Sequence, residues 1–449
     1  MTDHTETCPP RQKRFDQAGR CIKCGMCLAV CPSYRVTRLE SLGARGRMAA
    51  AGAIDLGQSD LLSPHLRETI TACLLCGACG RECAGGLSAD VVVQSLRQET
   101  VKAQGMPLVK KLLLEGLPPH GAVPRAASKT MSRVSAWLNQ CVPPGIGLRD
   151  RFPLPALLNR MYFPAIPRRS FLDAISTSTR DRIIPSTPPP ESGKPGPAGF
   201  RVALFLGCMA NYLLPEVSQA TVAILNRSGF TVTIPKNQTC CGLAAWSAGD
   251  VARSEALITA NLAVFKDIEA DYIVSPCDSC TAYLKTAAEH TRHPDALKLA
   301  GKVMPLSELL VNIAGLGQTG SAPFPDEARQ REDDHLPDLL VTYHDPCHLK
   351  NKLKITAAPR RLIASRPHVR LVEPGGQVTC CGHGGLFSVT HPGLSLKISE
   401  ERIDRIAGTM ADAVITGCMA CVLQLRDGAA RRGNSPLVLH LAEFLQSRI

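Results

Sequence analysis

Residues 21–32 read Cys21-Ile-Lys-Cys24-Gly-Met-Cys27-Leu-Ala-Val-Cys31-Pro32, in which four cysteines follow the spacing C-x₂-C-x₂-C-x₃-C-P. The same cysteine spacing returns 52 residues later, at Cys73, Cys76, Cys79 and Cys83. Ala84 stands there in place of the proline. A constant offset at four positions indicates a duplicated motif, and cysteines at such short spacings are typical of metal ligation.

This spacing is the one that bacterial ferredoxins use to hold two [4Fe–4S] clusters. Three cysteines of each motif surround one cluster, and the fourth begins a helix and serves the other cluster. The crossover predicts a first cluster on Cys21, Cys24, Cys27 and Cys83. It predicts a second cluster on Cys73, Cys76, Cys79 and Cys31. A pair of zinc ribbons is the alternative, but zinc takes four ligands per site and has no use for this eight-cysteine spacing.

The insertion between the two motifs contains Leu39–Gly46 and Arg47. We expect it to form helices that hold the motifs apart, with its basic residues at packing and surface positions.

The cysteine content and the polar start of the chain indicate in which compartment the protein works. The chain has twenty cysteines, and its first 17 residues are polar, without the apolar segment of a signal peptide. No apolar run approaches the roughly 18 residues that span a bilayer. We therefore expect a cytoplasmic protein, in which clustered cysteines bind metal or do redox work more often than they form disulfides.

Charge and aromatic content narrow the choice of partner. Aromatic residues make up 4% of the chain, which argues against a nucleic-acid binder that stacks bases. The net charge is +12, and residues 101–182 alone carry +9. Such a basic segment permits contact with an acidic partner or peripheral contact with the inner face of the cell membrane.

A second duplication occupies the C-terminal part of the chain. Its first copy contains Cys208, the pair Cys240–Cys241, Cys277 and Cys280. Its second copy, 139–141 residues later, contains Cys347, the pair Cys380–Cys381, Cys418 and Cys421. Only Cys8 and Cys141 fall outside the two duplications, and we do not expect them to be ligands.

Strand-like and helix-like stretches alternate around these cysteines. Short apolar runs occur at Arg201–Leu206, Phe230–Ile234, Tyr272–Val274, Leu339–Tyr343, Val369–Val372 and Ala413–Ile415. Helical patterns separate them, which predicts βαβ units and parallel sheets. Each cysteine group then lies beyond the carboxyl end of a strand, where open α/β sheets bind their ligands. The fold class is mixed: an α-helical ferredoxin-type domain for two [4Fe–4S] clusters, followed by a duplicated α/β domain.

Two Pro/Gly-rich breaks, at residues 185–200 and 316–338, read as linkers. We expect a two-cluster domain over 1–105 and a basic helical extension over 106–184. Two cysteine-rich domains are expected over 201–315 and 339–449.

Five cysteines in each C-terminal copy are one more than a four-iron cluster needs. The paired cysteines can reach neighbouring irons, and the glycine that follows them allows close approach of the backbone. Each C-x₂-C places two thiolates at a helix N-terminus, which favours their negative charge. We expect one or two further [4Fe–4S] clusters here, cubane or noncubane. Inert buried cysteines are the alternative.

Three histidines flank only the second copy: His344, His348 and His383. A histidine can tune a cluster through a hydrogen bond to sulfur, or it can serve as a structural donor. Their absence from the first copy indicates that the two copies have diverged.

Taken together, these motifs resemble the iron–sulfur subunit of glycolate oxidase and related lactate dehydrogenase complexes, which joins two [4Fe–4S] ferredoxin motifs to two CCG cysteine-rich domains. The resemblance covers nearly the whole chain, including residues 42–48 (LGARGRM) and 380–392 (CCGHGGLFSVTHP). It implies that an FAD-containing partner oxidises a glycolate- or lactate-type 2-hydroxy acid and that this subunit passes the electrons toward quinone or another carrier. The chain has no G-x-G-x-x-G dinucleotide fingerprint after a strand, which agrees with that division of roles.

The cysteine-rich subunit of anaerobic glycerol-3-phosphate dehydrogenase and the catalytic subunit of heterodisulfide reductase are similar more distantly. The complete pairs Cys277/Cys280 and Cys418/Cys421 resemble the heterodisulfide reductase type, which implies disulfide cleavage at a noncubane cluster as the alternative function. Independent catalysis by this chain therefore stays open. A third hypothesis is a zinc-binding scaffold without redox chemistry.

Overall fold

The computed structural model describes residues 15–115, 139–141, 148–150, 167, 169–175, 182–184, 199–317, 338–376, 380–433 and 436–447. Cys8 and the side chain of Cys141 lie outside this description, as do most residues of the two expected linkers. The expectations for those segments stay predictions.

The N-terminal part is helical, as predicted. Its elements are α1 (Asp16–Gly19), α2 (Met26–Ala29), α3 (Pro32–Thr37), the 3-10 helix η1 (Glu40–Leu42), α4 (Ala44–Asp55), α5 (Pro64–Thr71), α6 (Ala78–Arg81), α7 (Ala89–Gln104) and α8 (Leu108–Glu115). The insertion between the motifs thus forms helices, as expected. α4 packs against α7, and Ala51 and Leu96 are fully buried in the small core between them. This core holds the two cysteine loops together.

The basic extension contains strands as well as helix. In the residues that the structure describes there, β1 (Asn139–Cys141) pairs with β2 (Leu148–Asp150), and α10 (Phe171–Ile175) is a short helix. β3 (Arg182–Ile184) joins the edge of the next domain's sheet, antiparallel to β5 (Thr231–Ile234). The purely helical expectation for this segment was therefore wrong for these short strands, whose pairing depends on neighbours distant in sequence.

The first cysteine-rich domain is built on parallel strands in the order β5-β4-β6-β7, with β3 outside β5. The strands besides β5 are β4 (Arg201–Leu204), β6 (Tyr272–Ser275) and β7 (Val303–Pro305). The helices around them are α11 (Gly207–Tyr212), α12 (Pro215–Arg227), α13 (Leu243–Ala248), α14 (Val251–Phe265), α15 (Asp278–Lys285), η2 (Ala287–Glu289), α16 (Ala296–Lys302), α17 (Leu306–Glu308) and η3 (Leu309–Ile313). The predicted parallel α/β architecture is confirmed.

The second cysteine-rich domain repeats this topology in the order β9-β8-β10-β11, all parallel. Its strands are β8 (Leu339–Tyr343), β9 (Val369–Val372), β10 (Ala413–Thr416) and β11 (Leu437–His440). Its helices are η5 (His348–Lys352), α18 (Ala357–Ala364), α19 (Phe387–Thr390), α20 (Pro392–Ala407), α21 (Met419–Arg432) and α22 (Leu441–Gln446). β8 and β9 have the bounds that the sequence predicted.

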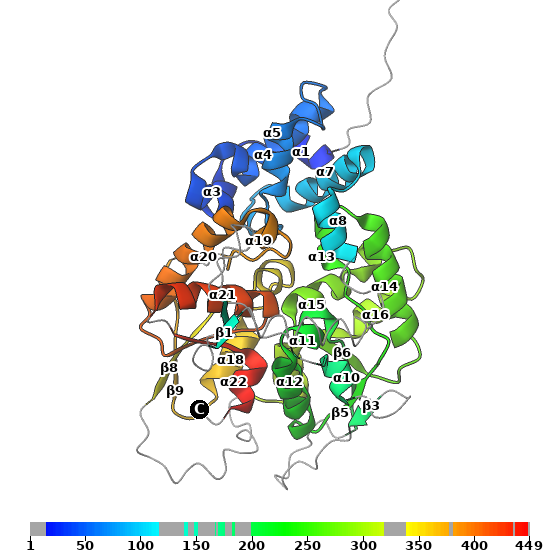
Figure 1. Ribbon diagram of the computed structural model, residues 1–449, viewed down its shortest axis with the longest axis vertical. Helices are drawn as coiled ribbons and strands as arrows, with labels where there is room; N and C mark the ends of the chain where they lie inside the picture. The colour runs from blue at the N-terminus through cyan, green and yellow to red at the C-terminus, as the bar shows by residue number, and fades with distance from the viewer. Residues whose placement is uncertain are drawn as a thin grey trace, which may run out of the picture.

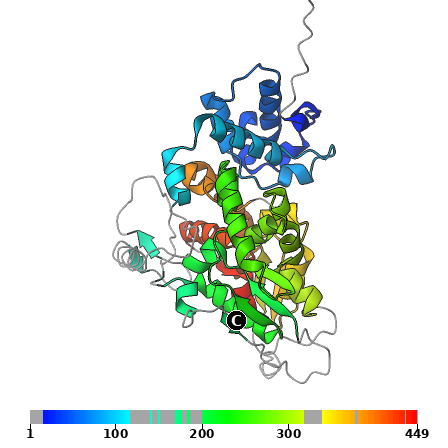
Figure 2. The same ribbon diagram turned by 90° about the vertical axis from the view of Figure 1, so that its right-hand side faces the viewer.

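The ferredoxin-type part lies at one end of the molecule, over both cysteine-rich domains (Figures 1 and 2). Arg35 Nε of α3 donates to Glu401 Oε1 of α20 at 3.0 Å. Arg97 Nη1 of α7 donates to Ser247 O, in α13, at 2.7 Å. The two cysteine-rich domains meet along α12 and α22 and share one continuous apolar core. The ferredoxin-type part is thereby held against both of them.

We expect a histidine in the first cysteine-rich domain to make the stability of the folded protein sensitive to acid. His290 stacks on Tyr283 with ring centroids 4.3 Å apart, and burial together with the Lys352 charge lowers the pKa of His290 to about 4. In the unfolded chain His290 takes up a proton near pH 6.5, whereas in the folded chain it stays neutral until about pH 4. The free energy of unfolding therefore falls as the pH drops from about 6.5 to about 4. We expect this to cost about 2 kcal/mol, because partial exposure reduces the full value.

Denaturant unfolding between pH 7.5 and pH 4.5 checks this expectation. His290→Gln will flatten part of the fall in unfolding free energy, whereas the same change at the exposed His65 will leave the slope as it is. Identical slopes in all three proteins would contradict it.

Candidate metal centres

The cysteines predicted for the second ferredoxin-type cluster line one small cavity. Its wall includes Cys31, Cys73, Cys76 and Cys79. Cys31 is the N-cap residue of α3, because Pro32 occupies the first helical position, where its missing N–H costs nothing. The backbone N–H of Leu75 points to Cys73 Sγ at 3.4 Å. The structure thus places together the three cysteines of one motif and the fourth cysteine of the other.

The turns between the clustered cysteines need left-handed backbone. Leu75 and Gly77 have φ of 53° and 74°, and Lys23 and Gly25 in the first motif have φ of 59° and 86°. The two motifs therefore share a backbone path as well as a spacing.

Arg47 lies behind this cavity and is 2% exposed, so the expectation of a packing or surface role missed its contact with a predicted ligand. Its Nη1 is 3.6 Å from Cys31 Sγ. Its other donors reach Thr69 O at 2.9 Å, Ser33 Oγ at 3.1 Å and Ala72 O at 2.8 Å. Burial opposes ionisation of the Cys31 thiol, but the Arg47 charge and the Ser33 hydrogen bond outweigh it and lower the pKa of Cys31.

The sequence did contain a signal for Arg47. It stands at helical spacing with three buried residues of α4: Ala44, Met48 and Ala51. A cation in the middle of an apolar helix face needs a buried anion or acceptor.

The cysteines predicted for the first cluster lie nearer the surface. Burial and the charges of Cys21, Cys31 and Cys24 raise the pKa of Cys27 to about 11. Cys83 packs with Cys21 and Cys27 in the N-terminal core. Cys24 is exposed, whereas none of the four cysteines of the second set is. Ile22 and Met26 beside Cys24 are 83% and 53% exposed.

The second cysteine-rich domain gathers its five cysteines at the carboxyl end of its sheet. Cys347 precedes η5, Cys380 and Cys381 follow β9, and Cys418 is the N-cap residue of α21. Cys381 Sγ lies 3.2 Å from Cys421 Sγ. The hydrogen-bonding contacts with the side chains of Cys380 and Cys421 lower the pKa of Cys381 to about 5. The geometry therefore favours a thiolate, the form that binds iron.

The first cysteine-rich domain repeats this arrangement. Cys208 Sγ lies 4.0 Å from Cys240 Sγ, and Cys241 and Cys280 are buried. Cys277 is the N-cap residue of α15, as Cys418 is of α21. None of the cysteines in the described part of the chain forms a disulfide.

The cysteine sets lie next to one another. Beside Cys277 of the first domain and Cys418 of the second, Ser279 Oγ lies 3.3 Å from Cys418 Sγ, and the Asp278 N–H donates to Gly417 O at 3.1 Å. On the other side, Cys76 of the ferredoxin-type part lines the same cavity as Cys347 and Cys380. The second ferredoxin set, the second cysteine-rich set and the first cysteine-rich set thus form a continuous line.

The three predicted histidines take three different roles. A ring nitrogen of His344 and the sulfurs of Cys381 and Cys421 lie within 4.8 Å of one another, all fully buried. His348 Nε2 instead lies 3.4 Å from Leu75 O and helps to dock the second domain on the ferredoxin-type part. His383 Nδ1 accepts a hydrogen bond from the Gly385 N–H within its own loop. His344 is therefore the one of these three that groups with two cysteine sulfurs in the described part of the chain.

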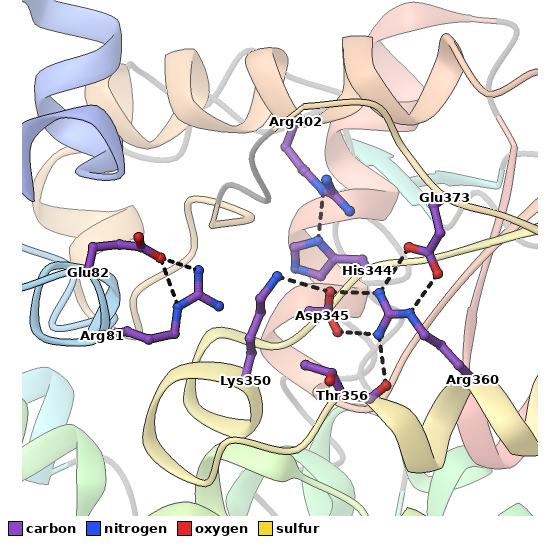
Figure 3. A network of polar contacts seen from close by, with 9 residues as sticks. All are labelled: Arg81, Glu82, His344, Asp345, Lys350, Thr356, Arg360, Glu373 and Arg402. Carbon is purple, nitrogen blue, oxygen red and sulfur yellow. Dashed lines mark hydrogen bonds and ion pairs between the residues drawn. The ribbon is translucent and has the colours of Figure 1, made fainter. Parts of the chain in front are cut away.

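A polar network surrounds this centre (Figure 3). Arg360 holds Asp345 with two hydrogen bonds of 2.7 and 2.9 Å, and Lys350 Nζ lies 3.6 Å from Asp345. A cavity of about 230 Å³ lies beside it, with Cys76, Cys347 and Cys380 in its wall. Lys350 also lines this cavity.

The donor chemistry fits iron–sulfur clusters. Each predicted site offers at least four thiols, held by loops and helix N-termini, and thiolate is the ligand that such clusters require. Zinc would suit any single group of four, but the contacts between the sets have no purpose in separate zinc sites.

Comparison with known proteins agrees with this interpretation. The family described as "4Fe-4S dicluster domain" matches residues 17–87, and the "Cysteine-rich domain" called CCG matches residues 202–285 and 341–426. The chain is 26% identical to the "Probable glycolate oxidase iron-sulfur subunit" of Bacillus subtilis, over 97% of this chain and 95% of that protein. It is 33% identical to "Lactate utilization protein A" of Geobacillus kaustophilus, over 56% of this chain and the full length of that protein.

The chain belongs to this family of iron–sulfur subunits. The resemblance stated from the sequence is confirmed, and so are its multiple [4Fe–4S] clusters and its place as a subunit of an oxidoreductase. Which cysteine holds which cluster stays a prediction. Among the helices that the structure describes, none is both long enough and apolar enough to cross a membrane.

Gly417 lies in the loop between β10 and α21, at the contact between the two cysteine-rich domains. We expect a larger side chain at this position to destabilise that contact. Asp278 N–H donates to Gly417 O at 3.1 Å, and a Cβ at position 417 would overlap the Asp278 carboxylate. Burial and the Cys418 charge raise the pKa of Asp278 well above its usual range, so extra crowding at position 417 falls on a carboxyl that is already buried. We expect Gly417→Ala to lower the free energy of unfolding by about 1–3 kcal/mol.

Denaturant unfolding measures this loss, and Asp278→Ala in the same chain will recover part of it. Gly301→Ala is the matched control, because a Cβ there meets nothing within 4 Å. Equal unfolding energies for Gly417→Ala and Gly301→Ala would contradict the expectation.

Proposed function

We propose that this chain is the electron-transfer subunit of a flavin-dependent 2-hydroxy-acid dehydrogenase complex. It receives electrons from an FAD-containing partner that oxidises a glycolate- or lactate-type acid, and it passes them toward quinone or another carrier. Two relatives are named glycolate oxidase iron-sulfur subunit and lactate utilization protein A, and these names support a 2-hydroxy acid as the substrate of the complex.

The observation that carries this proposal is the continuous line of cysteine sets. Electron transfer needs closely spaced redox sites, whereas a store of metal ions does not. We propose the ligand sets given above: Cys21, Cys24, Cys27 and Cys83 for the first cluster, and Cys31, Cys73, Cys76 and Cys79 for the second. The two cysteine-rich sets hold one or two further clusters.

When bound, the clusters supply one-electron carriers. The protein's own residues exclude water and hold the carriers close. Lys352 of η5 pairs with Asp90 of the ferredoxin-type part, and Asn351 Nδ2 donates to Cys76 O at 2.8 Å. These contacts fix the short step between the ferredoxin-type part and the second cysteine-rich domain.

The exposed cysteine set at the ferredoxin-type end supports the proposal that a partner protein docks there. Cys24 is the solvent-exposed member of the first set, and the apolar Ile22 and Met26 stand beside it. Exposed apolar side chains around a redox site are typical of a docking surface. We propose that the flavoprotein docks here and that electrons enter through the first cluster.

A reduction assay tests the proposal. The purified chain is mixed anaerobically with the flavoprotein and glycolate or lactate, and bleaching of its cluster absorbance is followed. We expect bleaching only when partner and acid are both present. Ile22→Glu will slow it strongly without changing iron content, whereas Leu297→Glu, at a 74% exposed position of α16, will not. Equal reduction rates for the two variants would contradict the proposed docking surface. Absence of any reduction would contradict the proposed function.

A second candidate is disulfide cleavage at the second cysteine-rich centre. The complete set of five cysteines and the adjoining cavity of about 230 Å³ favour it. It predicts disulfide reduction by the isolated chain with an artificial electron donor, lost in Cys380→Ser or Cys381→Ser. Inactivity of cluster-replete protein would reject it.

A further inference from the structure

The two cysteine-rich domains differ at two buried positions that their shared fold makes equivalent. Phe205 directly follows β4, and His344 directly follows β8. The backbone N–H of each donates to the adjacent strand, Phe205 to Val274 O and His344 to Ile415 O, both at 2.8 Å. The same backbone position therefore carries a phenyl ring in one domain and an imidazole in the other.

The second pair of equivalent positions lies on the helix that covers each Cys-Cys-Gly loop. A Cβ on Gly242 would contact Ser254 O, and a Cβ on Gly382 would contact Ser395 O. Asn261 stands seven residues after the first of these serines, and the second domain has Arg402 at that distance. An amide in α14 thus corresponds to a guanidinium in α20.

In the first domain, this pair is neutral and satisfied. Asn261 Oδ1 accepts from the Thr239 N–H at 2.8 Å, and its Nδ2 donates to Cys240 O at 2.9 Å. Phe205 packs against Phe265 with ring centroids 5.8 Å apart. These two residues bring neither charge nor a free donor to the first centre.

In the second domain, the pair is charged and not satisfied. Arg402 is 1% exposed, and its Nε donates to His344 Nδ1 at 2.9 Å. This hydrogen bond makes Nδ1 the acceptor, so the His344 proton sits on Nε2. Neither His344 Nε2 nor Arg402 Nη2 has a hydrogen-bond partner in the described structure. The imidazole lies beside Cys381 and Cys421, as described above.

The Arg402 charge has no carboxylate to balance it. No ion pair with Arg402 occurs among the described residues, and the nearby Asp345 is held by Arg360 and Lys350. A buried unpaired cation is costly unless an anion accompanies it. A cluster bound at the sulfurs of Cys381 and Cys421 would be the anionic group within reach.

We propose that Arg402 and His344 raise the reduction potential of the second cysteine-rich centre above that of the first. Reduction adds negative charge, which a buried guanidinium and an unpartnered imidazole N–H close to the sulfurs stabilise. The Phe205–Asn261 pair gives the first centre no such stabilisation. Electrons shared by the two centres therefore rest on the second, which adjoins both Cys76 and the cavity.

This inference rests on the proposed function only in requiring clusters in both cysteine-rich domains. Arg402 and His344 are positioning residues, because they act on the potential and take no part in ligation. Their role follows from charge and geometry and needs no particular electron donor or acceptor.

An anaerobic potentiometric titration of the full holo-chain, read by EPR, tests the proposal without any partner protein. Arg402→Asn and His344→Phe install the residues of the first domain. Each should lower the higher of the two cysteine-rich midpoint potentials, and the double variant should remove most of the gap. The ferredoxin-type signals should not move. Arg405→Gln is the control, because it removes an equal charge one turn along α20, where Arg405 pairs with Glu401.

Unchanged potentials in Arg402→Asn with full iron and sulfide content would overturn the inference. If Arg402→Asn fails to fold, Arg402→Lys and His344→Phe decide: a lower potential in His344→Phe alone supports it, and wild-type potentials in both overturn it. About eight irons per chain, with no signal beyond the ferredoxin type, would also overturn it. That last result would leave the proposed electron transfer through the ferredoxin-type part standing.

Discussion

Cys31→Ser will remove the cluster of the other motif. Cys31 shares its cavity with Cys73, Cys76 and Cys79, and a serine hydroxyl is a poor substitute for a thiolate on iron. We expect iron and acid-labile sulfide each to fall by about four per chain. Electrons from the flavoprotein should then stop at the first cluster, because the second links it to the cysteine-rich domains. Iron and sulfide analysis with EPR of the same anaerobic sample measures the loss.

Two variants serve as controls for this result. Cys83→Ser should remove the first cluster and leave the second, which is the reciprocal loss. Cys8→Ser should change neither, because Cys8 stands outside every repeated set. If Cys31→Ser instead lost the signal that Cys24→Ser loses, each motif would ligate its own cluster and the crossover would be wrong.

Strand positions could be read from the sequence where a short apolar run leads to a cysteine group. β8, β9 and β10 were predicted to within one residue, because each is a short apolar run that ends before a cysteine group. β3, β7 and β11 were missed. They lie at or near sheet edges and are three or four residues long, so neighbours distant in sequence decide whether they pair.

The members of each cysteine set could also be predicted from the sequence, because the duplication repeats the same cysteine spacing. The contacts between the sets could not be predicted from it. Cys277 lies beside Cys418 only because the two domains pack with the N-termini of α15 and α21 together, and spacing within one domain contains no record of that packing. Arg402 escaped attention for the same reason, since it lies 58 residues from His344 along the chain.

Buried or half-buried arginines are a shared feature of the cluster surroundings. Arg47 serves Cys31, Arg97 Nη2 donates to Cys73 O at 2.6 Å, and Arg402 reaches the second cysteine-rich centre through His344. Each places a positive charge where a cluster and its thiolates bring negative charge. The cations therefore offset the cost of burying the anionic groups, and each of them favours the reduced state.

Arg47→Met will destabilise the protein more than any other single change at a basic residue of α4. Methionine fills the space but donates nothing, so Thr69 O, Ala72 O and Cys31 lose their buried donor. Each unsatisfied carbonyl costs about 1–3 kcal/mol, and we expect a loss of about 3–5 kcal/mol in the free energy of unfolding. The pKa of Cys31 should rise at the same time, which weakens its hold on iron.

Anaerobic denaturant unfolding and iron analysis together separate the parts of the Arg47 effect. Arg47→Lys keeps the charge, but a single ammonium cannot reach all four acceptors, so it should restore the iron content more fully than the stability. Arg45→Met is the matched control on the same helix. Arg45 pairs with Glu40 at the surface, where solvent screens the pair and its contribution to stability is small. Similar losses for Arg45→Met and Arg47→Met would mean that the buried guanidinium contributes no more than a surface one, and the role argued for Arg47 at Cys31 would fail with it.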